Sequence, residues 1–446
     1  MLPAAFALLL LGVMGAVRHL PDAWQLFEPA RLSLGFGFLL LEAYLLGMVC
    51  ARARLPRISG YIAAGVLCGP HVLNLLDAEL AARMKFIDEL ALTFIALTAG
   101  AELRLALIRQ RLRTIGALIL SLTVLVGTGM AGAVFLLRDS LPFAQGLGPA
   151  GLGVLAAMIG VIAVARSPTS AIAIINECRA DGPFTNTLFG VTVAMDSLVL
   201  LLFALTVSLG EALVYAGRGV DTWFLAMVAA QLVASLLLGA GIGKGVAFYI
   251  RRVEKDLSVL LVVLAFLIAE TSRWLAHALD QSLGVSLHLE PLLIAMAAGF
   301  TVQNFTGEGD RLNRGLHGIS LPIFVVFFAV AGVVLDLGSL ASTWALALLF
   351  VGTRMALVST AGYVGCALAG EGPRFRRLAG LGFYTQAGVS LGLAQEVARR
   401  FPGWGGEVAT FLVACITVKE VLGPIAFKFA LDRAGESGRF RGLEGS

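Results

Sequence analysis

Long apolar stretches separated by short polar loops dominate the hydropathy pattern of this chain. Many stretches reach roughly 17 or more residues, enough to cross a bilayer core of about 30 Å as helices. A membrane β-barrel would instead show short segments of alternating polarity. The pattern therefore predicts an all-α polytopic membrane protein with 13–14 transmembrane helices. The candidate segments are 3–17, 33–51, 59–75, 87–108, 113–137, 149–175, 186–210, 222–250, 257–279, 288–305, 319–336, 341–369, 378–400 and 406–431.

Composition supports a membrane protein. Hydrophobic residues make up 58% of the 446 residues and charged residues only 14%, whereas a soluble domain carries about 25% charged residues. The 52 glycines suit close packing of helices in lipid. The five cysteines have no CxxC spacing and are interpreted as small core residues, which excludes a disulfide framework and a cysteine metal site.

Basic residues cluster in alternate loops. Placing the helices as predicted puts all of these loops on one face, and the positive-inside rule assigns that face to the cytoplasm. We expect a multi-pass protein of the cell membrane, the bacterial inner membrane, with a cytoplasmic C-terminal tail over 432–446. The basic loops are 52–57, 109–113, 251–255, 311–314, 373–377 and 432–441.

The first 32 residues form either an extra helix or a signal-like segment. The apolar stretch 3–17 begins Met-Leu-Pro and lacks the basic region that precedes the core of a signal peptide. This favours an extra helix. No GxSxG, HExxH or phosphate-binding loop occurs in the chain, so we expect no enzyme activity and no cofactor.

The chain shows weak internal symmetry. Residues 97–108 resemble 326–340, and each is followed by a long apolar segment, a segment interrupted by small polar residues, and a segment with an embedded acid. This predicts two six-helix repeats, 33–210 and 257–431, with core helices at about 113–210 and 341–431. A single connector helix within 211–256 lies between the repeats, so the second repeat enters the membrane from the opposite side and the two repeats are inverted. Inverted repeats are typical of secondary transporters.

Asp196 lies inside the apolar run VTVAMDSLVLLLFALTVS. An aspartate at the centre of a membrane helix costs about 2.5–3.5 kcal/mol on insertion scales, so such residues are functional candidates by default. A helix-terminal position would be the structural explanation, but the run continues apolar on both sides. A carboxylate in a low-dielectric cavity can hold either a proton or a cation, which is the property an antiporter needs.

The segment ARSPTSAIAII, 165–175, predicts a helix broken inside the membrane. Pro168 lacks an N–H and blocks one backbone hydrogen bond, while Ser167, Thr169 and Ser170 can satisfy the freed groups. Broken helices at this depth are tolerated only against protein or a water-filled cavity. A simple proline kink is the alternative, but the position directly before the Asp196 helix favours an ion site.

Further charged residues lie in apolar runs. Arg354 needs a partner or a water path, and we expect it either to pair with an acid in the cation-free state or to fix the broken helices. Lys419 and Glu420 form the counterpart of Asp196 in the second half, and either could serve Arg354 or a helix break. Glu290 precedes Pro291, and a helix N-terminus is its simpler interpretation.

Seven motifs in order over residues 33–432 resemble the monovalent cation:proton antiporters of the sodium/hydrogen exchanger superfamily, in its cation:proton antiporter-2 branch. One of them contains Asp196. The other motifs are LPRISGYIAAGVLCGPHVL, FIALTAGAEL, RSPTSAIAIINE, FFAVAGVVLDL, TQAGVSLGLA and KEVLGPIAFKFAL.

This resemblance implies an elevator-type transporter that forms a homodimer, with a mobile core of two crossing broken helices. It implies that Asp196 transiently binds a monovalent cation, Na⁺ or K⁺, or a proton. Ser167 and Thr169 match the family's first crossover. Supporting residues are Pro168, Ser170, Arg354, Thr385, Gln386 and Glu420.

One position departs from the family pattern. Relatives place a second acid or an asparagine directly before the core aspartate, whereas this chain has Met195. With one titrating carboxylate, we expect electroneutral exchange of one cation for one proton. Two alternatives stay open: a potassium-efflux system with a separate regulatory subunit, and a membrane sensor or scaffold that no longer transports.

Overall fold

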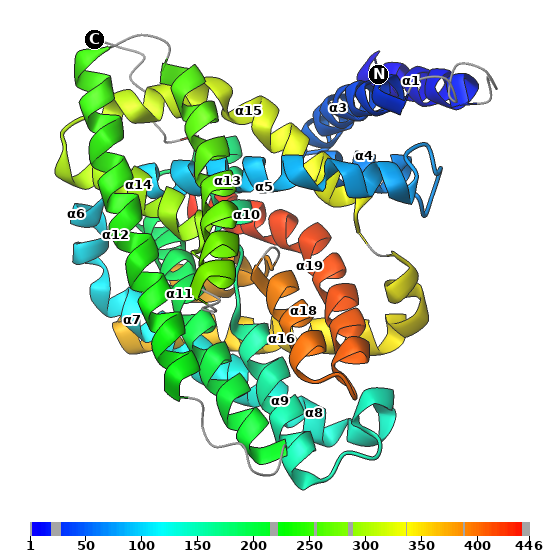
Figure 1. Ribbon diagram of the computed structural model, residues 1–446, viewed down its shortest axis with the longest axis vertical. Coiled ribbons are helices and arrows are strands. Elements are labelled where there is room, and N and C mark those ends of the chain that lie inside the picture. The colour runs from blue at the N-terminus through cyan, green and yellow to red at the C-terminus, as the bar shows by residue number, and fades with distance from the viewer. Residues whose placement is uncertain are drawn as a thin grey trace.

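The computed structural model describes residues 2–18, 28–214, 222–253, 257–283, 289–335, 337–386 and 389–438, and every regular element in these ranges is helical. Figure 1 shows long helices packed side by side, with α1 (Leu2–Arg18) and α3 (Glu28–Arg52) projecting at one end of the molecule. Eight helical segments of the described chain are long and apolar enough to cross a membrane, and five shorter apolar helices accompany them. The protein is therefore a multi-pass α-helical membrane protein.

One set of helices, here the α5 group, packs around α5 and α14. Helix α5 lies against α14 and α15, α14 lies against α12, and α15 also contacts α4, which pairs with α3. Helix α1 packs on α3, so the first apolar stretch is a helix within the fold. Besides α3, the group contains α4 (Arg57–Cys68), α5 (Ala78–Glu102), α12 (Thr222–Arg252), α13 (Leu257–Leu283), α14 (Pro291–Phe305) and α15 (Gly309–Val333).

A second set, the α11 group, contains the broken helices. Helix α9 packs on α8 and α11, and α19 packs on α16 and α18. The helices α10 and α19 also touch α4, and α10 touches α5, so the two groups meet along these elements. The group contains α7 (Leu112–Ser121), α8 (Gly127–Leu136), α9 (Pro149–Val164), α10 (Pro168–Cys178), α11 (Pro183–Val214), α16 (Leu337–Ala369), α17 (Pro373–Ala379), α18 (Val389–Arg400) and α19 (Gly405–Ala434).

Several predicted segments are subdivided in the structure. The segment 59–75 ends as a helix at Cys68, because Gly69 and Pro70 follow and proline disfavours helix in the residue before it. The segment 87–108 turns after Glu102 and resumes as α6 (Leu105–Gln110). The segment 113–137 contains a π-helical turn, Leu122–Val126, between α7 and α8. Short 3₁₀ turns lie at Arg138–Ser140, Pro142–Ala144 and Gly380–Phe383.

Loops with many arginines gather on one face, here the basic side. Arg111 in the α6–α7 turn pairs with Glu371 before α17 at 2.9 Å, and Arg251 at the end of α12 pairs with Glu308 at 3.1 Å. The chain after α19 reaches the same face, since both oxygens of Glu436 accept backbone N–H bonds at the start of α11. Residues beyond 438 of the predicted tail lie outside the described chain.

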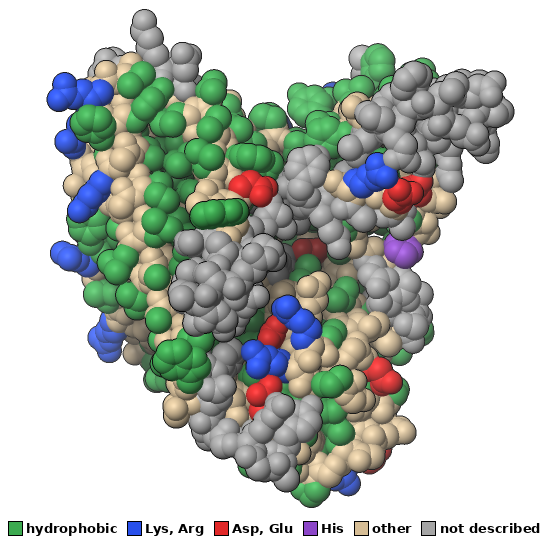
Figure 2. All heavy atoms as spheres, viewed as in Figure 1, with side chains coloured by type: hydrophobic (Ala, Val, Ile, Leu, Met, Phe, Trp, Pro, Cys, Tyr) green, Lys and Arg blue, Asp and Glu red, His purple; other side chains and the backbone are tan. Residues whose placement is uncertain are grey.

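Large apolar side chains are exposed on the outer helices. On α12 and α13 they include Leu237, Phe248, Val259 and Leu267, each 52% exposed or more. Figure 2 shows a face that is largely hydrophobic, with lysine and arginine side chains along one edge. Apolar area of this extent fits contact with lipid or with another membrane protein surface.

Glycines allow α5 and α14 to pack with their backbones in contact. A Cβ on Gly100 would overlap the carbonyl oxygen of Met296, and one on Gly299 would overlap that of Leu97. We expect Gly100→Ala to destabilise the fold by about 1–3 kcal/mol, the usual cost of overpacking. Thermal unfolding of the detergent-purified protein measures this. Gly241→Ala on α12, where a Cβ meets nothing within 4 Å, is the control, and equal unfolding temperatures for both variants would contradict the prediction.

Candidate ion-binding site

The first helix break lies between α9 and α10, where the sequence predicts it. Residues 165–167 are non-helical, Ser167 is the N-cap of α10, and Pro168 occupies its first turn. The Ser167 hydroxyl accepts the Ser170 N–H at 3.2 Å, lies 3.0 Å from the Thr169 hydroxyl and donates to the Ser170 hydroxyl at 2.9 Å. This network satisfies the backbone N–H of Ser170 in the first turn of α10 and orients three hydroxyls there.

The second break precedes α18. Residues 384–386 are non-helical, and residues 387–388 of the predicted break lie outside the described chain. Thr385 and Gln386 are buried, at 2% and 1% exposed. The Gln386 amide donates to the carbonyl oxygen of Ile162 in the last turn of α9 at 2.6 Å. The two interrupted segments therefore meet directly.

Arg354 on α16 connects the two breaks. Its guanidinium is 1% exposed and donates to the carbonyl oxygens of Ala163 at 2.8 Å, Ala165 at 3.1 Å and Tyr384 at 3.2 Å. The last carbonyls of a helix have no partner within the helix, and a cation there also interacts favourably with the helix dipole. Of the two roles expected for Arg354, the structure shows the contacts required for fixing the broken helices.

Lys419 on α19 lies on the same side of the breaks as Arg354. It is 4% exposed, and its ammonium donates to the side-chain oxygen of Gln386. Lys419, Arg354 and Gln386 line one small cavity with apolar neighbours. The adjacent Glu420 lines neither this cavity nor the one beside Asp196, because neighbouring residues on a helix point about 100° apart.

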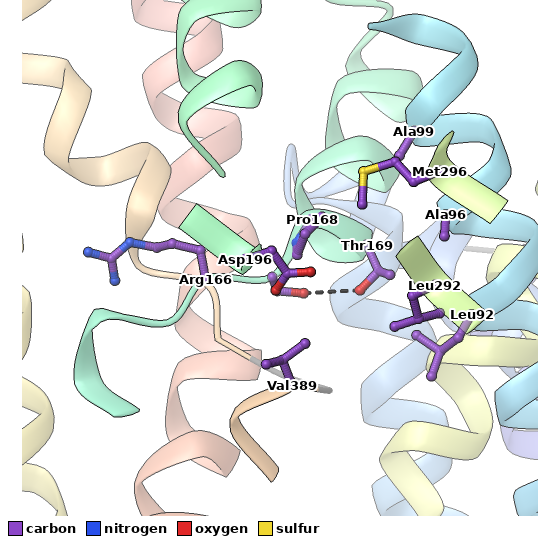
Figure 3. A pocket seen from close by; sticks show the side chains of 11 residues that line it. Leu92, Ala96, Ala99, Arg166, Pro168, Thr169, Asp196, Leu292, Met296 and Val389 are labelled. Carbon is purple, nitrogen blue, oxygen red and sulfur yellow. Dashed lines mark hydrogen bonds between the residues drawn. The ribbon is translucent and has the colours of Figure 1, made fainter. Parts of the chain in front are cut away.

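Asp196 lies beside the first residues of α10 and α18, the helices that follow the two breaks. It lines a cavity of about 20 Å³ together with Ser167, Pro168 and Thr169, which is enough space for one water-sized occupant. Its Oδ1 atom is enclosed and has no hydrogen-bond partner among the described residues. In Figure 3 the carboxylate points toward Thr169, and side chains of α5 and α14 face it from the far side of the cavity.

The two sides of the crossing have opposite electrostatic character. The N-terminal ends of α10 and α18 adjoin the cavity, since Pro168, Thr169 and Val389 line it. The C-terminal carbonyls of α9 lie on the side of Arg354. Helix N-termini stabilise anions and C-termini stabilise cations. The arrangement therefore stabilises a carboxylate on one side and buried cations on the other.

Arg166 is a site residue that our sequence reasoning passed over. It is 1% exposed, donates to the Ala165 carbonyl at 3.3 Å and lies 5.8 Å from the Phe383 ring centre. It adjoins the Asp196 cavity, and Figure 3 shows its guanidinium directed away from Asp196. The signal in the sequence was the position of this arginine, inside an apolar segment and directly before Ser167 and Pro168.

A polytopic helical membrane protein whose two interrupted helices meet beside a buried carboxylate has the architecture typical of secondary transporters. Residues 38–432 match the sodium/hydrogen exchanger transmembrane family, and the chain belongs to that family. This confirms the family that the sequence motifs indicated. It also confirms the all-α membrane fold.

Individual relatives agree with this assignment. The chain is 22% identical over 404 residues to the probable Na(+)/H(+) antiporter 3 of Methanocaldococcus jannaschii, covering 88% of this chain and 95% of that protein. Two solved structures of the sodium proton antiporter MjNhaP1 from the same organism share the fold. One, at pH 8, has a TM-score of 0.64 with 16% identity, covering 92% of this chain and 100% of the other. An electron-microscopy structure has a TM-score of 0.69 with 15% identity, covering 94% and 100%.

Proposed function

We propose that this transporter exchanges a monovalent cation, Na⁺ or K⁺, for protons, and that Asp196 carries both in turn. The observation that supports this most is the enclosed Oδ1 of Asp196, which lines a water-sized cavity and has no partner in the described part of the chain. A carboxylate in this position can be neutralised by a proton or by a cation. Since one occupant excludes the other, their binding is competitive.

Oxygen atoms beside Asp196 can complete a cation site. The hydroxyls of Ser167 and Thr169 lie at the same cavity and are held 3.0 Å apart. Hard cations take oxygen ligands, and no described cluster of three or more His, Cys, Asp or Glu side chains suggests a resident metal. The cation would therefore be a transient substrate at Asp196, with Ser167 and Thr169 as its nearest further ligands.

The position of the cavity supports an elevator mechanism. One wall belongs to the α11 group, through Asp196, Thr169 and Val389, and the opposite wall belongs to the α5 group, through Ala96 and Met296. The α5-group wall is apolar, so it offers no polar group to hold the ion. Movement of the α11 group along this wall would carry Asp196 from one aqueous face to the other. A homodimer through the α5 group would keep that group fixed, with the basic side in the cytoplasm.

Transport by vesicles tests the proposal. Everted membrane vesicles from a host without other cation antiporters are acidified inside, and Na⁺, Li⁺ or K⁺ is then added. We expect at least one of these cations to dissipate the pH gradient when this protein is present. The absence of a response to every cation would favour a sensor or scaffold that no longer transports. A response to K⁺ alone would favour a potassium-efflux system.

We expect the exchange to be electroneutral. Met195 is fully buried and does not line the Asp196 cavity, so Asp196 is the carboxylate that the α11 group contributes to this cavity. If one cation replaces one proton on it, no net charge crosses the membrane. In proteoliposomes with a potassium diffusion potential set by valinomycin, the initial rate of Na⁺/H⁺ exchange should be the same at zero and at about 100 mV, where one net charge would gain about 2.3 kcal/mol.

The matching control measures the leak of empty liposomes under the same potential. An exchange rate that rises with the imposed voltage, after the leak is subtracted, would contradict one-for-one exchange. It would require a second titrating group to move together with Asp196.

A further inference from the structure

Glu177 near the end of α10 joins the two helix groups by hydrogen bonds. Its carboxylate accepts the backbone N–H of Arg57 at 2.5 Å and that of Ile58 at 3.4 Å, both at the start of α4. Helix α4 belongs to the α5 group, whereas α10 belongs to the α11 group. The exchange reaction proposed above does not use this contact.

The start of α4 has no cap from its own segment. The first N–H groups of a helix lack partners within the helix, and the N-cap residue Pro56 makes no side-chain hydrogen bond to them. A carboxylate is a strong acceptor for such groups, because its charge also interacts favourably with the helix dipole. Glu177 therefore caps α4 from a position 119 residues beyond Ile58 in the chain.

Helix α10 connects this cap to the ion cavity. Thr169 lines the Asp196 cavity in the first turn of α10, and Glu177 lies eight residues later, about 12 Å along an uninterrupted helix. The carbonyl oxygen of Cys178 accepts the N–H of Gly438 at 2.9 Å, which places this end of α10 on the basic side. The position of Glu177 against α4 therefore fixes the position of Thr169 against the α5 group.

The contacts between the two groups differ in kind along α10. At the cavity the wall of the α5 group is apolar, through Ala96 and Met296, and apolar contacts are not directional. The hydrogen bonds of Glu177 are directional and are lost beyond a donor–acceptor distance of about 3.5 Å. Movement of the α11 group along the wall would break them. Glu177 therefore stabilises the arrangement in this structure relative to the one reached after that movement.

We propose that Glu177 is a positioning residue that holds the α11 group against the α5 group in one end state of transport. This inference rests on the exchange function proposed above. By stabilising one end state, Glu177 sets the fraction of molecules in which Asp196 faces each side of the membrane. The apparent affinity for a ligand is reduced by the fraction of molecules in the competent state. Glu177 thus sets the ratio of the cation affinities on the two faces.

Glu177→Ala is expected to change this ratio. Hydrogen bonds to a charged acceptor are about twice as strong as neutral ones, and their loss in one end state shifts the balance between the two states on the order of tenfold. The half-maximal Na⁺ concentration is measured in everted and in right-side-out vesicles, and the ratio of the two values should change by about that factor. Glu177→Gln, which keeps an oxygen acceptor but loses the charge, should give a smaller change in the same direction.

Glu436→Ala is the matched control. Glu436 is also a carboxylate that accepts two N–H groups at a helix start, those of Phe184 at 2.9 Å and Thr185 at 2.7 Å. It follows α19, which belongs to the same group as α11, so its substitution should lower the unfolding temperature and leave the ratio between the faces unchanged. A ratio for Glu177→Ala equal to that of wild type, or an equal change in Glu436→Ala, would overturn the inference.

Hydrogen–deuterium exchange of the purified protein tests the contact independently of transport. The amides of Arg57 and Ile58 should exchange hydrogen faster in Glu177→Ala than in wild type, and at the wild-type rate in Glu436→Ala. Equal hydrogen exchange in Glu177→Ala and wild type would overturn the inference while cation transport by the wild type leaves the proposed function standing. Lack of cation transport by the wild type would instead remove the proposed function itself.

Discussion

Asp196→Asn is expected to abolish cation-driven proton movement, leaving vesicles indistinguishable from those without the protein. Asparagine has the shape of aspartate but neither takes up a proton nor neutralises a cation, so the competition at the cavity is lost. Folding should be retained, because Oδ1 of Asp196 has no hydrogen-bond partner among the described residues and the substitution removes a buried charge. The measurement is the dissipation of a pH gradient by Na⁺, Li⁺ and K⁺ in everted vesicles.

Asp139→Asn is the control for this experiment. Asp139 is 91% exposed in the turn after α8, far along the chain from either helix break, and its substitution should leave transport unchanged. A cation response of Asp196→Asn equal to that of wild type would remove Asp196 from the mechanism. Equal amounts of both variants in the membrane must be verified by immunoblot.

Arg354→Ala is expected to cause the largest loss of stability. The carbonyl oxygens of Ala163 and Tyr384 would lose the donor that Arg354 provides. The carbonyl oxygen of Ala165 would lose one of two donors, because Arg166 also donates to it. Each unsatisfied buried acceptor costs about 1–3 kcal/mol, and loss of a charged partner adds to this. We expect a total of about 3–5 kcal/mol, partial recovery in Arg354→Lys because one ammonium cannot reach all three acceptors, and loss of transport in both variants.

Thermal unfolding of the detergent-purified protein, followed by size-exclusion chromatography, measures this prediction. Arg138→Ala is the comparison, since the Arg138 side chain is 60% exposed and its ion pair with Asp139 lies at the surface, where such pairs contribute about 0–1 kcal/mol. If Arg354→Ala and Arg138→Ala unfold at the same temperature, the guanidinium does not fix the broken helices.

Hydropathy predicted most of the helices, because burial in lipid requires long apolar segments whatever the tertiary arrangement. Pro168 gave the position of the first break, since its missing N–H has a local effect that sequence shows directly. The second break has no proline. Its position depends on two tertiary hydrogen bonds. Gln386 donates to the carbonyl oxygen of Ile162, which is 224 residues away in the chain, and Arg354 of α16 donates to that of Tyr384. In the sequence, only the small polar residues of TQAGVS indicated this break.

Side-chain direction was the part that sequence could not supply. Lys419 and Glu420 were equal candidates in the sequence, yet the packing of α19 directs Lys419 to Gln386. Met195 was unexplained as a neighbour of Asp196. In the structure it packs in the interior and away from the cavity. Glu290 had a local interpretation as a helix N-terminus, and the structure places it at the N-cap of α14.

Proton release on cation binding tests most directly whether Asp196 holds either a cation or a proton. Purified protein in weakly buffered detergent solution is titrated with NaCl while pH is recorded, with choline chloride as the ionic-strength control. Competition at a single carboxylate predicts release of about one proton for each Na⁺ bound, weaker Na⁺ binding as pH falls, and no release from Asp196→Asn. Na⁺ binding to the wild type without proton release, or undiminished release from Asp196→Asn, would contradict exchange at this residue.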